Sequence, residues 1–224
     1  MAKEPSRDVI KRIIKYMSLG RGIEVKRIGD TKILRIEWLN LYNEPEVLNA
    51  IGGLIAFWIK TLGYKPDAIT SVETSGAKYG ISASSHLSIP YFSLHKIDKV
   101  IFNDPVYVES RSITESRALK LYADRSIVNK FNNVVLVDDI RRTSNTIDSA
   151  VELVEKCGSK VCSCFVVLDF KFTGHPYPKK IRRDRFHSLF VISKVSDDGK
   201  CEVKNGLALE YIKKGERKLI GDEK

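Results

Sequence analysis

The sequence lacks any run of about 18 apolar residues, the length that a membrane-spanning helix needs, so we expect no contact with a membrane. Its first residues, MAKEPSRD, lack the apolar core of a secretory signal peptide, which predicts a cytoplasmic protein. The glycine-rich patterns G-x-x-x-x-G-K-[ST] and G-x-G-x-x-G are also missing. Two common kinds of nucleotide-binding loop are therefore poorly supported.

Cysteine is scarce, with four residues in the chain: Cys157, Cys162, Cys164 and Cys201. Cys162 and Cys164 would share one face of a strand, but no second pair of ligands matches them, which argues against a zinc site. Thiols in the cytosol stay reduced. We therefore interpret the cysteines as buried structural residues.

The composition is that of a folded, basic protein. The chain has 224 residues, of which 43% are hydrophobic, enough for one substantial core. Its formal net charge is +10 and its isoelectric point is about 9.4. Such a charge suits a polyanionic ligand, either a diphosphate compound or a nucleic acid.

The most informative segment begins with the apolar run Val134–Val137, which has no polar alternation and predicts a strand covered on both faces. Two adjacent carboxylates, Asp138 and Asp139, follow it. Apolar residues at helical spacing then predict a helix over about 145–157, and 161–168 is the next apolar run. Strand, helix and strand make one βαβ unit, which places the turn 140–146 at the carboxyl edge of a parallel sheet.

That turn has the groups that an anion and a sugar require. Free N–H groups at a helix start favour an anion, and Thr143, Ser144 and Thr146 add hydroxyl donors. The two carboxylates can accept hydrogen bonds from sugar hydroxyls or hold a hydrated Mg²⁺. An Asp-Asp pair can also serve merely as turn or helix-cap chemistry, but the surrounding pattern favours a binding site.

A second βαβ unit precedes the first. It consists of a strand over 68–72, a helix over 76–87 and a strand over 90–94, with the turn Glu73–Lys78 at its carboxyl edge. The two turns can face one crevice only if their strands are neighbours in the sheet. In that case they can hold one molecule with phosphates at both ends.

Residues 134–146 resemble the phosphoribosyl-diphosphate (PRPP) signature of the type I phosphoribosyltransferases. The residues that match it are Asp138, Asp139, Ile140, Thr143 and Thr146. Two residues depart from it: Ser144 stands where the family usually has Gly, and Arg142 stands where many 6-oxopurine enzymes have an Asp assigned to proton transfer. The resemblance implies an open, mainly parallel twisted α/β sheet with helices on both faces, a flexible β-hairpin and a small hood.

We expect the chain to divide into three parts, and the resemblance implies roles for its residues. The resemblance covers about residues 65–170, the expected PRPP-binding core. From composition and periodicity, residues 1–64 would be an N-terminal helix and strand extension, and 171–224 a C-terminal β-rich hood or dimer segment with a further strand over Leu207–Ile212. Asp138 and Asp139 would be catalytic, holding the ribose and, through water, Mg²⁺. The expected substrate-binding residues are Arg142, Thr143, Ser144, Asn145 and Thr146 for the 5′-phosphate, and Thr74, Ser75, Gly76, Ala77, Lys78 and Lys96 for the diphosphate.

A polar hairpin should close over the ligand. Residues 106–108 and 118–122 are predicted strands, and the tip between them is charged. In the resembling family this segment covers PRPP and excludes water. We expect Arg111 to bind the diphosphate and Arg117 to act in catalysis, although a solvated hairpin without a role is the alternative.

The implied reaction is transfer of the 5-phosphoribosyl group from PRPP to a purine base, with adenine favoured. Orotate or a 6-oxopurine is the enzymatic alternative, and a PRPP-sensing transcriptional regulator of the same fold is the alternative from another class. The basic run 179–185 is compatible with a solvated face, a dimer contact or a nucleic-acid patch. The N-terminal segment is too short for a winged-helix domain of about 60 residues, so nucleic acid is a less favoured partner than a nucleobase. The family is commonly dimeric, which implies a homodimer.

Overall fold

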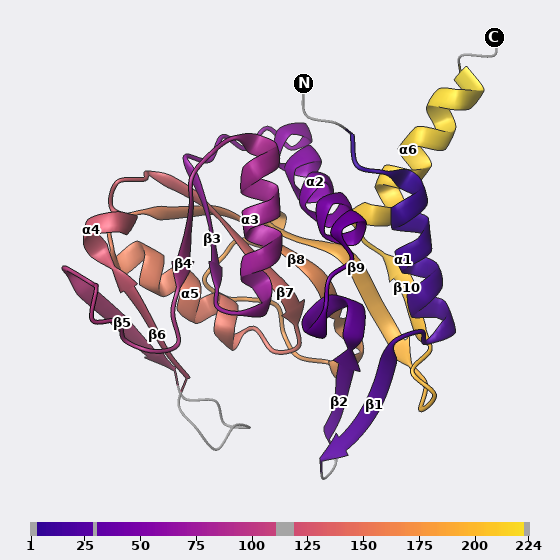
Figure 1. Ribbon diagram of the computed structural model, residues 1–224, viewed down its shortest axis with the longest axis horizontal. Coiled ribbons are helices and arrows are strands. Elements are labelled where there is room, and N and C mark those ends of the chain that lie inside the picture. The colour runs from indigo at the N-terminus through magenta and orange to yellow at the C-terminus, as the bar shows by residue number, and fades with distance from the viewer. Residues whose placement is uncertain (1–3, 29–30, 111–118, 222–224) are drawn as a thin grey trace.

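The computed structural model describes residues 4–28, 31–110 and 119–221, which are built around one six-stranded sheet (Figure 1). In spatial order its strands are β10 (Cys201–Asn205), β9 (Phe186–Val195), β8 (Lys160–Phe170), β7 (Asn133–Arg141), β3 (Ala68–Val72) and β4 (Tyr91–Leu94). The strands from β9 to β4 run parallel, and β10 at the edge runs antiparallel. The open, mainly parallel sheet predicted from the sequence is confirmed.

The order of the strands reverses between β3 and β7. Helix α3 (Ser75–Leu87) connects β3 to β4 on one side, and helix α5 (Asn145–Lys156) connects β7 to β8 on the other. The two helices cover opposite faces, because α3 packs with Val135 and Val137 of β7, whereas α5 packs with Val134 and Leu136. Ligands of open α/β sheets bind at such a reversal, outside the carboxyl ends of the strands.

The N-terminal segment covers the face that carries α3. It contains α1 (Arg7–Leu19), the hairpin of β1 (Ile23–Ile28) and β2 (Thr31–Ile36), the π-helical turn η1 (Glu37–Leu41) and α2 (Pro45–Thr61). Helix α1 begins where the Ser6 hydroxyl accepts the N–H of Val9, and it ends at Gly20, whose φ is +69°. The β1–β2 hairpin and η1 reach the carboxyl edge of the sheet (Figure 1).

A second hairpin lies on the other side of that edge. It is formed by β5 (Pro105–Ser110) and β6 (Leu119–Asp124), followed by the short helix α4 (Arg125–Val128). Val106, Val108 and Leu121 pack into the same core as α5. The hairpin predicted from the sequence is therefore present, but its tip, with Arg111 and Arg117, lies outside the described residues.

The C-terminal segment continues the sheet through β9 and β10, so the predicted boundary near residue 170 is not a break in the core. Two short 3₁₀ turns precede β9, η2 (Lys171–Thr173) and η3 (Arg183–Arg185). The expected strand over Leu207–Ile212 is wrong, since helix α6 spans Leu207–Gly221. Buried Ala208, Tyr211 and Ile212 follow helical spacing. Nowhere in the described parts of the chain is a helix long and apolar enough to span a membrane.

Candidate functional site

The acidic pair lies near the end of β7, between the two hairpins. The side chain of Asp138 is buried, and its Oδ1 accepts the backbone N–H of Asp139 at 3.0 Å. Burial, and then the charge of Asp139, raises the pKa of Asp138 well above its ordinary value, whereas the charge of Lys96 acts in the opposite direction. Oδ2 of Asp139 accepts a hydrogen bond of 2.6 Å from Nδ2 of Asn40 in η1.

The two strand-end turns meet at this pair. Because β3 and β7 are neighbours, the start of α3 lies against the end of β7. A Cβ atom on Gly76 would lie 3.0 Å from Oδ1 of Asp138 and 3.2 Å from the carbonyl oxygen of Val137. Glycine is required for this close approach. The expectation that the two turns follow neighbouring strands of the sheet is confirmed.

The first turn brings cationic and N–H groups towards the carboxylates. Thr74 precedes α3 and Ser75 opens it, so their N–H groups and those of Gly76 and Ala77 lie where a helix leaves donors without partners. Burial lowers the pKa of Lys78, and the charge of Asp139 opposes that effect. The arrangement offers an anion N–H donors with a lysine beside them.

A polar cluster around Glu73, which the sequence analysis did not select, lies beside the first turn. Oε2 of Glu73 lies 2.9 Å from Nδ1 of His95 and 3.8 Å from Nζ of Lys99. His95 also contacts the ring of Phe102, at a centroid distance of 5.3 Å. Glu73 thus connects β3 to the segment after β4 that carries Lys96.

The second turn differs in one respect from what its sequence predicts. Strand β7 continues to Arg141, and α5 begins at Asn145, so the turn itself is short. Asn145 and Thr146 open the helix as expected. The hydroxyl of Ser144, however, donates to the carbonyl oxygen of Pro176 at 2.6 Å. That hydroxyl is therefore bonded within the protein, and the N–H group of Ser144 is what the turn offers to a ligand. Its φ is −100°, so Ser replaces Gly here without a left-handed backbone.

The structure places several residues near the site that the sequence analysis did not select. Asn40 gave no sequence signal, because it lies in the π-helical turn after β2 and belongs to no motif. Arg141 lies inside the signature and Asp169 ends an apolar run, and their buried ion pair is formed by residues 28 positions apart. A local sequence pattern cannot predict a pair formed by residues so far apart in the chain.

The acidic pair fits a hydrated divalent cation shared with a ligand. The described residues contain no group of three or more His, Cys, Asp or Glu side chains that could bind a metal alone. Two carboxylates, one of them buried beside its neighbour's charge, instead match a Mg²⁺ that keeps waters and takes further oxygens from a substrate phosphate. Asp138 and Asp139 are the residues that would hold it.

Comparison with known proteins agrees with this geometry. Residues 37–202 match the phosphoribosyl transferase domain family. The chain is 21% identical over 183 residues to xanthine phosphoribosyltransferase 1 of Clostridium botulinum, covering 81% of this chain and 90% of that one. It is 22% identical to the purine biosynthesis transcriptional repressor PurR of Bacillus subtilis, covering 78% of this chain and 59% of the repressor.

A likeness to solved structures is also found. The crystal structure of adenine phosphoribosyltransferase from Thermoanaerobacter pseudethanolicus superposes with a TM-score of 0.64 at 22% sequence identity. The match covers 80% of this chain and 98% of that enzyme. At this identity the likeness establishes a common fold.

Proposed function

This chain belongs to the phosphoribosyl transferase domain family, and from that premise we propose that it transfers the 5-phosphoribosyl group of PRPP to a purine base and releases diphosphate. The observation that supports this most directly is the contact between the two strand-end turns at Asp138 and Gly76. That contact leaves one anion-binding helix start on each side of a carboxylate pair. PRPP has the matching order of groups, with a phosphate, a sugar diol and a diphosphate.

In this proposal the acidic pair binds the ribose. The hydroxyls of the sugar donate to Asp138 and Asp139 and relieve the unfavourable pairing of two adjacent carboxylates. The N–H groups at the start of α5 hold the 5′-phosphate. The start of α3, together with Lys78 and Lys96, holds the diphosphate. Arg111 and Arg117 stay predictions for the hairpin that would close over the ligand.

Catalysis then consists of positioning and charge stabilisation. The bond between C1 of ribose and the diphosphate breaks, and a ring nitrogen of the base forms the new bond from the opposite face. When bound, Mg²⁺ supplies positive charge to the departing diphosphate. The side chains of Lys78 and Lys96 supply further positive charge from the protein.

The N-terminal segment is our choice for the cover over the base, in place of the C-terminal hood suggested by the sequence. Asn40 is hydrogen-bonded to Asp139, and the next two side chains, Leu41 and Tyr42, are 58% and 53% exposed. By contrast Phe170 and Phe186, two aromatic residues of the C-terminal part of the chain, are buried in the core. An exposed aromatic and an aliphatic side chain beside the acidic pair suit a planar base.

Incubation of the protein with PRPP, Mg²⁺ and a panel of bases tests the reaction. The panel is adenine, xanthine, hypoxanthine, guanine, orotate and uracil, and the readout is diphosphate release with formation of the nucleotide. We expect turnover with a purine, adenine first, because Arg142 stands where many 6-oxopurine enzymes carry an acid. Turnover with orotate alone would refute the purine assignment.

A PRPP-sensing regulator is the second candidate. It is favoured by the similarity to the PurR repressor and by the net charge of +10. PRPP binding without turnover of any base, together with salt-sensitive retention of DNA, would favour this candidate over the enzyme.

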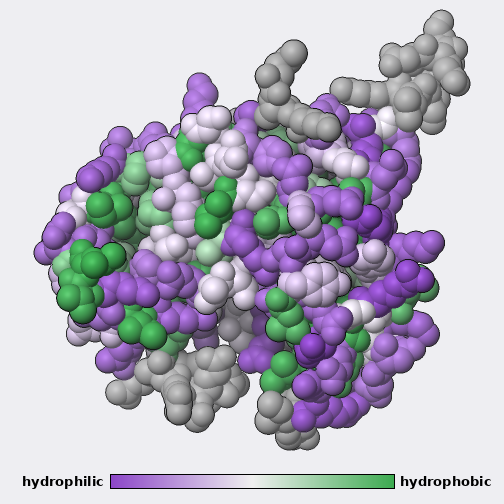
Figure 2. Space-filling view, viewed as in Figure 1, coloured by the Kyte–Doolittle hydropathy of each residue, from purple (hydrophilic) through white to green (hydrophobic). Residues whose placement is uncertain are grey.

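The homodimer stays a prediction. Exposed apolar side chains gather near β5 and α4 (Figure 2), and the strongly exposed members close to Lys96 are Ile97, Val100 and Ile101. Sedimentation of the wild-type chain beside Ile101→Glu tests whether this surface joins two copies.

A further inference from the structure

We propose that Arg141 and Asp169 are positioning residues whose buried ion pair fastens the strap, residues 171–177, to the phosphate turn, residues 142–146. The inference deepens the proposed function and rests on it, because the turn is taken to bind the 5′-phosphate of PRPP. Neither residue contacts the ligand in this account. Both act through the backbone that does.

The ion pair is fully enclosed. Nε and Nη2 of Arg141 lie 2.7 and 2.6 Å from Oδ1 of Asp169, and the two side chains are 1% and 0% exposed. Oδ2 of Asp169 accepts a further hydrogen bond of 3.0 Å from the hydroxyl of Ser188. A buried pair is costly to desolvate unless its remaining groups are hydrogen-bonded. Here they are, and the partners on one side belong to the strap.

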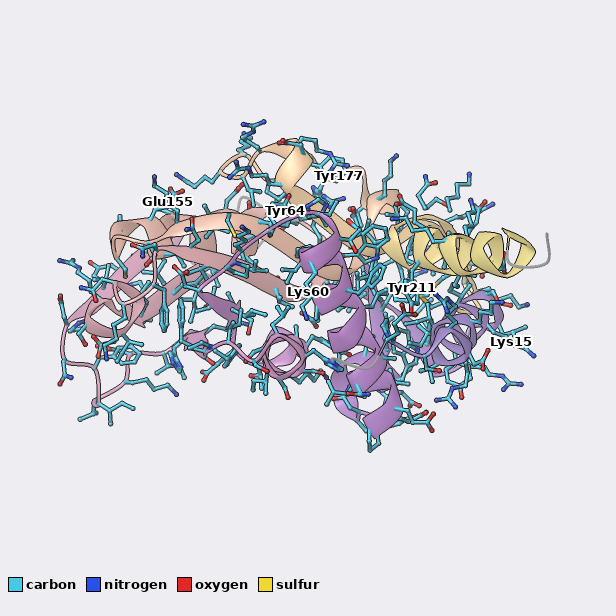
Figure 3. All side chains as sticks on the ribbon, turned by 90° about the horizontal axis from the view of Figure 1, so that it is seen from above. Lys15, Lys60, Tyr64, Glu155, Tyr177 and Tyr211 are labelled. Atoms are coloured by element: carbon cyan, nitrogen blue, oxygen red, sulfur yellow. The ribbon has the colours of Figure 1, made fainter. Side chains whose placement is uncertain are left out.

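The guanidinium connects the sheet to the strap. Nη1 of Arg141 donates to the carbonyl oxygens of His175 and Pro176, each at 3.2 Å. The ring of Tyr177 packs against the same guanidinium, with its centroid 4.7 Å from Cζ of Arg141. Tyr177 lies beyond the sheet from α2, on the face that carries α5 (Figure 3).

The phosphate turn is bonded to the strap along its length. The Ser144 hydroxyl donates to Pro176, and the hydroxyl of Thr173 donates to the carbonyl oxygen of Arg142 at 3.1 Å. Just beyond the strap, the N–H groups of Lys179 and Lys180 donate to Oδ1 of Asp148 in the first turn of α5, at 2.8 and 2.9 Å. The turn and the helix start are thus fixed by one continuous segment.

These hydrogen bonds determine which polar groups of the turn face the strap and which are left for a ligand. The Ser144 hydroxyl and the Arg142 carbonyl are turned towards the strap, whereas the N–H groups at the start of α5 have no intrahelical acceptor and are available to a phosphate. A turn ordered before the ligand arrives loses less conformational entropy on binding. The ion pair therefore raises affinity for the phosphate without touching it.

A paired substitution isolates this role. Arg141→Met with Asp169→Leu removes the ion pair while leaving no buried charge unpaired, so the fold should survive. The matched control is Arg182→Gln with Asp184→Asn, which removes an exposed Arg–Asp pair of 2.9 Å from the same C-terminal segment. The measurements are PRPP affinity by calorimetry without a base, kcat and KM, the thermal midpoint, and amide exchange in residues 171–177.

For the buried-pair variant we expect about tenfold weaker PRPP binding and a matching rise in KM, with kcat changed little, because preorganisation acts on binding. Amide exchange in the strap should accelerate, and the control should match wild type in every readout. Arg141→Lys should keep the fold and still bind PRPP weakly, because one ammonium cannot reproduce the fork of the guanidinium. If the buried-pair variant does not fold, Thr173→Val decides, since it removes one anchor and should also weaken PRPP binding.

The possible failures are distinguishable. A folded buried-pair variant, or a folded Thr173→Val, that binds PRPP as tightly as wild type overturns this inference and leaves the proposed function intact. Wild-type protein that binds no PRPP refutes the proposed function, and the inference with it.

Discussion

Two buried aspartates lie near the ends of neighbouring strands of this sheet, and their surroundings are opposite. Asp169 on β8 is bonded to Arg141 and Ser188, so its charge is neutralised inside the protein. Asp138 on β7 is buried beside a second carboxylate, and its pKa is raised well above the ordinary value by burial and by the charge of Asp139. The charge of Asp169 is balanced within the protein, whereas the carboxylates of Asp138 and Asp139 would be stabilised by further hydrogen-bond donors or positive charge.

The difference between the two aspartates distinguishes a structural ion pair from a candidate binding site. A protein satisfies its structural buried charges, because an unpaired one destabilises the fold. Local rules are broken mainly where a ligand supplies the missing partner. In the proposed function the acidic pair is therefore where a ligand would gain binding energy, and in the further inference the Arg141–Asp169 pair holds the adjacent backbone in place.

The largest expected effect breaks the unsatisfied region. Asp138→Asn with Asp139→Asn should reduce kcat/KM by about 10³-fold or more, because the ribose and any hydrated cation lose their acceptors. Circular dichroism should report an intact fold. Asp98→Asn, at an exposed acid close to Lys96, is the matched control and should keep wild-type activity. Near-wild-type turnover in the double variant would remove the acidic pair from the mechanism.

The second largest effect is expected from breaking the Arg141–Asp169 ion pair. Asp169→Asn keeps the shape of the side chain but leaves the buried charge of Arg141 without a counter-charge. The substitution should therefore lower the free energy of unfolding by about 3 kcal/mol or more. Denaturant titration measures it. A loss below about 1 kcal/mol would mean that solvent or another acid neutralises Arg141 in the folded protein.

A third prediction concerns His187, a partly buried histidine of β9. Nε2 of His187 lies 2.9 Å from the hydroxyl of Tyr64, and burial and then the charge of Arg183 lower the pKa of His187 to about 4. The unfolded chain takes up this proton below about 6.5, so the contribution to stability is full above that pH and is lost between pH 6.5 and 4. It amounts to about 3 kcal/mol at most.

The variant His187→Phe measures that contribution, because phenylalanine cannot take up a proton. Its stability should fall less steeply than that of wild type between pH 6.5 and 4. Parallel curves over this range would show that His187 is protonated in the folded state.

The smallest expected effect is an increase in stability, opposite in sign to the effect of Asp169→Asn. Because the folded-state pKa of Asp138 is raised, its ionised form costs stability at every pH above the unfolded value. Asp138→Asn should therefore stabilise the ligand-free protein at pH 7 by about 1 kcal/mol, at the expense of activity. Calorimetry should find a rise in thermal midpoint of about 2–4 °C. A fall would indicate that a partner within the protein already stabilises the carboxylate.

The sequence was sufficient for the parts of the fold that local pattern controls. The unbroken apolar run of β7, the helical spacing of α5 and the second βαβ unit predicted the sheet and the edge at which the turns lie. The sequence alone could not predict that Ser144 would turn its hydroxyl to Pro176, or that Asn40 would reach Asp139, because both contacts join segments far apart in the chain. Leu207–Ile212 was misassigned because a short apolar stretch fits both periodicities.

The contact between Gly76 and Asp138 has a consequence for ligand choice. It places the start of α3 against β7, the strand that leads to α5, so that both helix starts lie at the same edge of the sheet. A molecule phosphorylated at one end engages a single helix start, whereas a doubly phosphorylated sugar engages both, and its second contact forms at high effective concentration. If the proposed function holds, bivalence rather than the strength of either contact would separate PRPP from the many singly phosphorylated sugars of a cell.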